Sequence, residues 1–129
     1  MRVFISPIAD NPTAQIAIAA VGILILLDVV TGFTGAAITH TISSKKMREG
    51  ALHKFTELIL VALATIIDGA LLGGFDVLGG DPVLLVTCGY ISVMEVSSVL
   101  ELVAKYNPDI AGAGILALFE PKGEHKDGE

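Results

Sequence analysis

The sequence is poor in charged residues, which make up 17% of its 129 positions against about 25% in ordinary soluble domains. Apolar residues account for 53% of the chain, and its mean hydropathy is +0.74. A chain this short leaves a large share of its surface exposed in any fold, so its interior is too small to bury that apolar excess. The composition therefore disfavours a soluble globular domain.

Cysteine, tryptophan and basic residues are also scarce. The single Cys88 permits no internal disulfide and no multi-cysteine metal site. Lys and Arg number 8 against 14 Asp and Glu, and the net charge of -6 argues against nucleic acid as a partner. His40, His53 and His125 show no metal-ligand spacing and pair with no evident nucleophile. We therefore expect no cofactor, no metal and no catalytic residue, and the chain is not predicted to be an enzyme.

Three apolar segments have the length of about 20 residues that a helix needs to cross roughly 30 Å of hydrocarbon. They cover approximately residues 12–39, 55–76 and 82–106. Asn11 followed by Pro12, and Asp81 followed by Pro82, are typical of helix starts. The sequence therefore predicts an all-α integral membrane protein with three transmembrane helices.

The C-terminal part of the chain is predicted to lie outside the spans. Residues 108–119 follow another helix-start pattern but are too short to cross a membrane, which predicts an interfacial helix, with a loosely ordered linker as the alternative. Residues 120–129 form a charged tail that we expect to be disordered. Residues 1–119 are thus interpreted as one membrane-embedded domain. A cleavable signal peptide is disfavoured because Asp28 interrupts the first apolar run.

Basic residues are distributed unevenly between the two connections. The segment between the first two spans contains Lys45, Lys46, Arg48 and Lys54, which predicts a basic loop, whereas the second connection contains no base. Because basic loops face the cytoplasm, the pattern predicts an orientation with the N-terminus outside and the C-terminus inside.

Each predicted span has one acid near its midpoint: Asp28, Asp68 and Glu95. An acid at the centre of a membrane helix costs roughly 2.5 to 3.5 kcal/mol on insertion scales. We therefore expect the three carboxyl groups to share one depth and to face each other, other subunits or water. One interpretation gives them a role in assembly and gating. The alternative is that they are neutral and serve only as hydrogen-bonding groups in helix packing.

Small and polar residues accompany these acids on one face of each helix. Gly32, Gly35 and Ala36 lie on the first helix with Asp28, at spacings that let helix backbones approach closely in lipid. The corresponding faces of the other two helices consist of Glu57, Val61, Ala64, Thr65 and Asp68, and of Cys88, Ser92, Glu95 and Ser98. Since three helices enclose little water, these faces predict homo-oligomerisation.

The order of these features resembles the toxin-secretion and phage-lysis holins. The resemblance covers roughly residues 24–119 and includes the first-span segment from Leu27 to Gly32, the Ser44–Gly50 segment followed by Lys54, and Asp68. In the third span it rests on Tyr90, Ile91, Glu95, Ser98 and Glu101. Leu102 departs from the family pattern, which usually has Asn after the second Glu.

The resemblance implies a protein of the bacterial cytoplasmic membrane that forms large homo-oligomers in the lipid bilayer. It implies a timed opening that releases an endolysin, or in some relatives a toxin, as cargo without stable binding, with an antiholin as a further partner. Two other functions remain open at this point: a small proton-linked channel or transporter, and an antiholin or structural membrane subunit.

The predicted orientation can be tested by cysteine-accessibility labelling in a Cys88→Ala background. Probes introduced at Asn11 or Gly79 should react from outside intact cells, because both positions lie on the predicted outer side. A probe at Ser44 should react only after permeabilisation. Labelling at Ser44 in intact cells would contradict the orientation.

Overall fold

The computed structural model describes residues 5, 8–74 and 82–111, and the regular structure within these residues is helical. Its three long helices are α2 (Pro12–Ile38), α3 (Ser44–Gly74) and α4 (Pro82–Tyr106), and a short α5 (Pro108–Ala111) follows. All three long helices are apolar and long enough to cross a membrane. The predicted three-span, all-helical architecture is thereby confirmed. The rest of the predicted interfacial helix, and the tail, lie outside the described residues.

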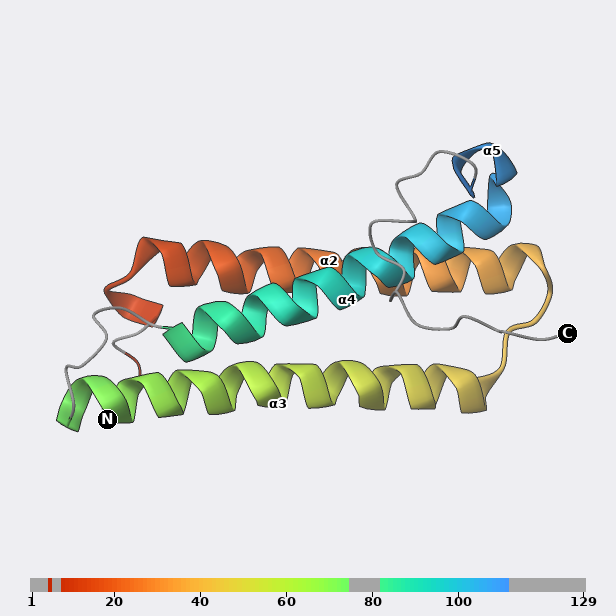
Figure 1. The fold of residues 1–129 in the computed structure, drawn as a ribbon. Helices are drawn as coiled ribbons and strands as arrows, with labels where there is room; N and C mark the ends of the chain where they lie inside the picture. The colour runs from red at the N-terminus through yellow and green to blue at the C-terminus, as the bar shows by residue number, and fades with distance from the viewer. Residues whose placement is uncertain (1–4, 6–7, 75–81, 112–129) are drawn as a thin grey trace, which may run out of the picture.

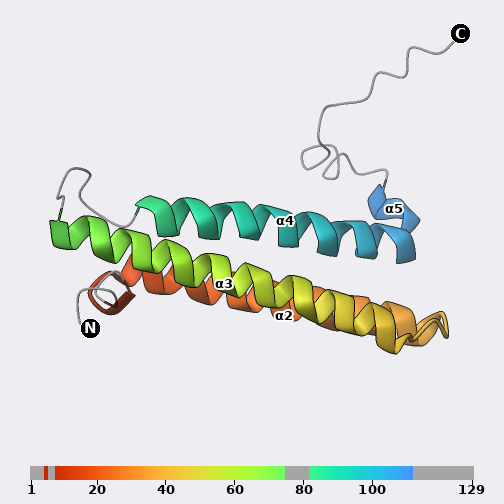
Figure 2. The same ribbon diagram turned by 90° about the horizontal axis from the view of Figure 1, so that it is seen from below.

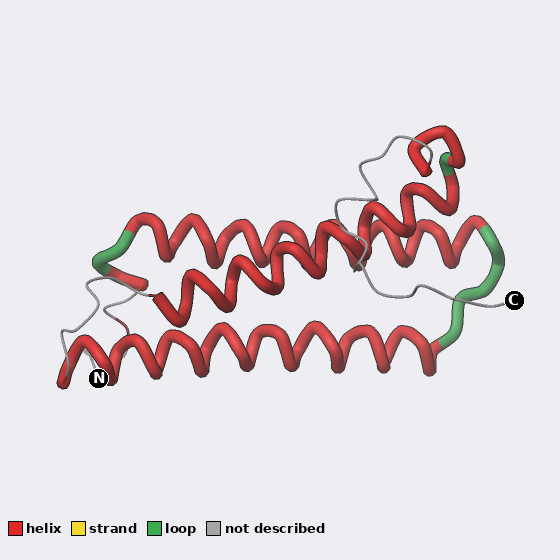
Figure 3. Tube along the Cα trace, viewed as in Figure 1, coloured by secondary structure: helices red, strands yellow, loops and turns green. Residues whose placement is uncertain are grey.

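The chain reverses direction between α2 and α3 and again between α3 and α4, so that α2 and α4 are parallel and α3 is antiparallel to both (Figures 1 and 3). α4 packs against both α2 and α3. Seen from below, α4 lies to one side of the α2 and α3 pair, and α5 turns away from the end of α4 (Figure 2). α4 is therefore the helix through which the bundle is held together.

Local sequence explains both ends of α2. The side chain of Asn11 accepts hydrogen bonds from the backbone N–H groups of Thr13 and Ala14, at 3.0 and 3.4 Å, as the predicted N-cap requires. At the other end, His40 adopts a φ of 53°. The N–H groups of His40 and Thr41 return to the carbonyls of Ala37 and Ala36, at 3.3 and 2.9 Å, which is a Schellman ending.

α3 begins about ten residues earlier than the sequence pattern predicts. The segment that carries Lys45, Lys46, Arg48 and Lys54 is helical from Ser44 onward, so the prediction of a basic loop there was wrong. Lys, Met, Arg and Glu are good helix formers, and no proline interrupts the segment. The predicted boundary followed apolar character, whereas the helix continues beyond the apolar run.

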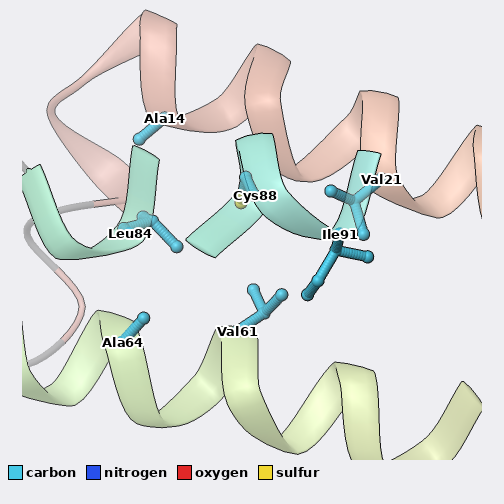
Figure 4. Close-up of a cluster of buried hydrophobic side chains, with 7 residues drawn as sticks. All are labelled: Ala14, Val21, Val61, Ala64, Leu84, Cys88 and Ile91. Atoms are coloured by element: carbon cyan, nitrogen blue, oxygen red, sulfur yellow. The ribbon is translucent and has the colours of Figure 1, made fainter. Parts of the chain in front are cut away.

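A small apolar core lies where the three helices meet toward the start of α4, and Figure 4 shows its side chains pointing toward one another. It consists of Ala14, Val21, Val61, Ala64, Leu84, Cys88 and Ile91. Large apolar side chains are exposed on every long helix; they include Ile23, Phe33, Leu58, Leu63, Val86 and Tyr90. Apolar surface facing outward all round a helix bundle is what lipid stabilises and water does not.

Gly35 of α2 is buried because it lies against Tyr106 at the end of α4. A Cβ atom at Gly35 would overlap the hydroxyl group and ring carbons of Tyr106. Gly22, on the same helix, has nothing within 4 Å of such an atom. The packing of α4 therefore excludes a side chain at Gly35 but not at Gly22.

Gly35→Leu is expected to lower the free energy of unfolding in detergent micelles by about 1–3 kcal/mol, the usual cost of overpacking. Gly22→Leu is the matched control and should cause no loss. Combining Gly35→Leu with Tyr106→Ala should restore part of the stability. Equal stability of Gly35→Leu and Gly22→Leu would show that α2 and α4 do not meet at this point.

Candidate functional site

Lys54 joins all three long helices. Its Nζ lies 2.5 Å from both Oε1 and Oε2 of Glu95 on α4, and 2.9 Å from Oδ2 of Asp28 on α2. The Lys54 and Asp28 side chains are each 14% exposed, and that of Glu95 is 3% exposed. A cation from α3 thus pairs with an acid from each of the other two helices inside the bundle.

Ser98 completes the partners of Asp28. Its Oγ donates a hydrogen bond to Oδ1 of Asp28 at 2.6 Å, so both carboxylate oxygens of Asp28 have a partner. Ser98 lies one turn after Glu95 on α4, which places both residues on the face that meets α2. The packing of α2 on α4 at this level is therefore polar and directional.

Glu57 adds a third carboxyl group, one turn beyond Lys54 on α3. It is 4% exposed, and its oxygens accept no hydrogen bond from the described residues. Its Oε2 lies 3.9 Å from Nζ of Lys54, and its Oε1 lies 3.1 Å from Nε2 of His53. We refer to Lys54, Asp28, Glu95 and Glu57 together as the Lys54 cluster. Its link to the surface is His53, whose side chain is 59% exposed.

The Lys54 cluster is unbalanced in charge. When fully ionised it has three carboxylates and one ammonium group, and His53 adds at most one positive charge. Uncompensated charge costs far more in hydrocarbon than in water. The bundle therefore holds a group of side chains whose most charged form is favoured by water.

Asp68 does not belong to this cluster, and the expectation that the three acids share one depth was wrong. Its two carboxylate oxygens accept the backbone N–H groups of Val83 and Leu84, at 3.2 and 2.6 Å. The first N–H groups of a helix have no hydrogen-bond acceptor within that helix. The carboxylate of Asp68, on the neighbouring α3, is the acceptor for α4. Glu95 lies about 17 Å further along α4 at about 1.5 Å per residue. Asp68 thus fastens α3 to the start of α4.

The small-residue face of α2 is turned toward α4 of the same chain. Gly35 lies against Tyr106, and a Cβ at Gly32 would lie 3.9 Å from Cδ1 of Leu102. Ala36 is half-buried nearby. These residues let two helices of one protomer approach closely, and their role in contacts between protomers stays a prediction.

Sequence reasoning placed Lys54 in a loop and so missed the residue on which the site depends. The signal was its spacing, because Lys54 lies three residues before Glu57, and Glu57 opens the face that continues to Asp68. That face is buried along its whole length within the bundle. Extending the 3.6-residue period by one turn would have placed Lys54 on the same face. Lys45, Lys46 and Arg48 are exposed in the first turns of α3.

The site holds charged side chains inside the bundle, and their ion pairs and hydrogen bonds link the helices to one another. Among the described residues, no group of three or more His, Cys, Asp or Glu is arranged to hold a metal ion. The cluster offers fixed charges and proton-exchanging groups within a bundle of membrane-length helices. Such a site defines a small multi-span membrane protein with an internal ion-pair network.

Comparison with known families identifies which proteins of this class the chain belongs to. The model of the bacteriophage holin family matches residues 13–112, which include α3, α4 and all of α2 except Pro12. The chain therefore belongs to the bacteriophage holin family, whose members are non-enzymatic proteins of the host cytoplasmic membrane. The resemblance seen in the sequence is thereby confirmed. No curated protein and no solved structure shows a significant match.

Lys54→Met should destabilise the bundle by about 3–5 kcal/mol, because it leaves the carboxylates of Asp28 and Glu95 buried without their cation. Unfolding in detergent micelles measures the loss. The control is Lys45→Met, since Lys45 is exposed and its nearest acid, Glu49, lies 3.9 Å away. Adding Asp28→Asn and Glu95→Gln to Lys54→Met should recover much of the stability. A small effect of Lys54→Met alone would contradict the buried ion pairs.

Proposed function

We propose that this chain is a holin that oligomerises in the bacterial cytoplasmic membrane and opens it at a timed point to release an endolysin. Family membership supports this class of function. The observation that carries the mechanism is the Lys54 cluster, in which Lys54 lies within 2.9 Å of acids on both other helices. Toxin release is the variant of the same function that the family resemblance implies.

In the proposal, the three-helix bundle is the closed protomer. The Lys54 cluster is turned inward, and large apolar side chains face lipid. An aqueous lesion needs a wall with polar groups on one side, and one protomer of three helices cannot enclose it. Rearrangement of several protomers, with the Lys54 cluster turned toward water, supplies that wall.

Charge sets the direction of this rearrangement. Water stabilises the fully ionised Lys54 cluster more than hydrocarbon does, so wetting and ionisation favour each other. A charge that crosses the membrane field gains or loses about 2.3 kcal/mol per 100 mV. The equilibrium between closed and wetted protomers is therefore linked to the membrane potential. Asp28 and Glu95 are assigned to this gating, whereas Asp68 is assigned to fastening α3 to α4.

The proposed orientation places the N-terminus outside and the C-terminus inside. It is supported by the exposed basic residues at one end of the bundle, where α3 begins and α4 ends. In this orientation the Lys54 cluster lies about 15 Å from the cytoplasmic start of α3. At that level Lys54 lies beside Asp28 and Glu95, which are near the midpoints of α2 and α4.

Reconstitution separates this function from its alternatives. Liposomes are loaded with a small dye and with a folded protein of endolysin size, and release of each is followed as the protein density is raised. A holin should release both above a threshold density. Release of the dye alone would indicate a channel or transporter. Release of neither cargo would indicate an antiholin or structural subunit. Both outcomes would contradict the proposal.

Glu95→Gln should delay lysis when the protein is co-expressed with an endolysin. The substitution leaves Asp28 as the counter-ion of Lys54 and removes one negative charge from a cluster with an excess of acids, so the closed protomer holds less uncompensated charge away from water. A change of about 1.4 kcal/mol slows opening about tenfold. Glu49→Gln, at an exposed acid on α3, is the control. Unchanged lysis onset for Glu95→Gln, at equal membrane levels, would show that this carboxylate has no role in gating.

A further inference from the structure

A second site lies at the end of the bundle where α2 ends, α3 begins and α4 ends (Figure 1). A cleft of about 500 Å³ opens there between the three helices. Most of its wall is apolar and includes Phe33, Ala36, Met47 and Leu102. Its volume is in the range of small-molecule sites, which is roughly 300–1,000 Å³.

The mouth of the cleft is positively charged, although the chain has a net charge of -6. It is lined by Lys46, Lys54 and Lys105, and Asp28 is the acid among its lining residues. Lys54 is paired with Asp28 at 2.9 Å. Lys46 and Lys105 are exposed, and neither has a carboxylate within 4.0 Å in the part of the chain that the structure describes. Two ammonium groups are thus available to an anion.

The order of these groups along the bundle matches the chemistry of a phospholipid. Lys46 lies in the first turn of α3 and Lys105 in the last turn of α4, so both are at the end of the helices, at headgroup level. Phe33 and Leu102 lie about one turn deeper. Basic pockets between transmembrane helices bind anionic headgroups in this way.

We propose that this cleft binds one anionic phospholipid of the adjacent leaflet. The phosphate lies between Lys46 and Lys105, and an acyl chain packs against Phe33, Ala36 and Met47. The lipid fills the space between the end of α2 and the start of α3. These two helices are otherwise held together by packing against α4. This lipid site is distinct from the proposed lysis function and can be tested independently of it, because lipid binding can be measured without the formation of a lesion.

Because the chain has no tryptophan, a single introduced indole reports on the cleft. Phe33→Trp places the reporter in the cleft wall. Phe55→Trp is the matched control, because Phe55 is also an exposed phenylalanine, 59% exposed, and does not line the cleft. Each variant is reconstituted in phosphatidylcholine, and fluorescence quenching by brominated phosphatidylglycerol is compared with quenching by brominated phosphatidylcholine.

Phe33→Trp should show a preference of about fivefold or more for the anionic lipid, which corresponds to at least one lysine contact. Phe55→Trp should show a ratio near one. Adding Lys46→Gln and Lys105→Gln to Phe33→Trp should abolish the preference, whereas adding Lys45→Gln and Arg48→Gln, outside the cleft, should leave most of it.

Equal quenching of Phe33→Trp by the two lipids would overturn the proposal. Protection of its indole from both lipids, increasing with protein density, would also overturn it and identify a second copy of the chain as the occupant. Liposome release by Phe33→Trp, measured in parallel, shows whether the reporter variant retains the activity assigned to the whole protein.

Discussion

Neutralisation of Lys54 is the constraint on which the bundle depends. A lysine about 15 Å from the start of a membrane helix needs a counter-ion, and Asp28 and Glu95 supply two from different helices. The contacts of Lys54 with these two acids then fix the rotation of all three helices about their axes. Apolar packing alone does not do so, because the core is small and lipid accepts the remaining apolar faces equally well.

The same constraint links stability to opening. Polar groups that are paired inside a protomer hold it closed while the surroundings are apolar, and the same groups are solvated once water enters. The excess of acids over bases makes this exchange sensitive to charge. A bundle fastened by ion pairs is therefore suited to a protein that is inert at first and later rearranges, whereas a bundle fastened by apolar packing alone has no such dependence on water.

The two ends of the bundle are fastened by different interactions. Asp68 accepts the first free N–H groups of α4 at one end, and Tyr106 covers Gly35 at the other. Near the second end the helices leave a basic cleft, which the proposed lipid fills. Both ends rely on groups whose partners are remote in sequence, so neither contact is visible from local pattern.

The sequence by itself determined the number of long helices, the start of α2 at Asn11 and Pro12, and the buried face of α3 from Glu57 to Asp68. Composition, capping and the 3.6-residue period act locally, so one chain reveals them. It did not determine that Lys54 is helical and pairs with Asp28 and Glu95, or that Asp68 lies far from both acids. Those depend on how far α3 extends and how the helices are staggered, and stagger is set by contacts between residues 26 to 70 positions apart. Only the tertiary structure decided which acids share a cation.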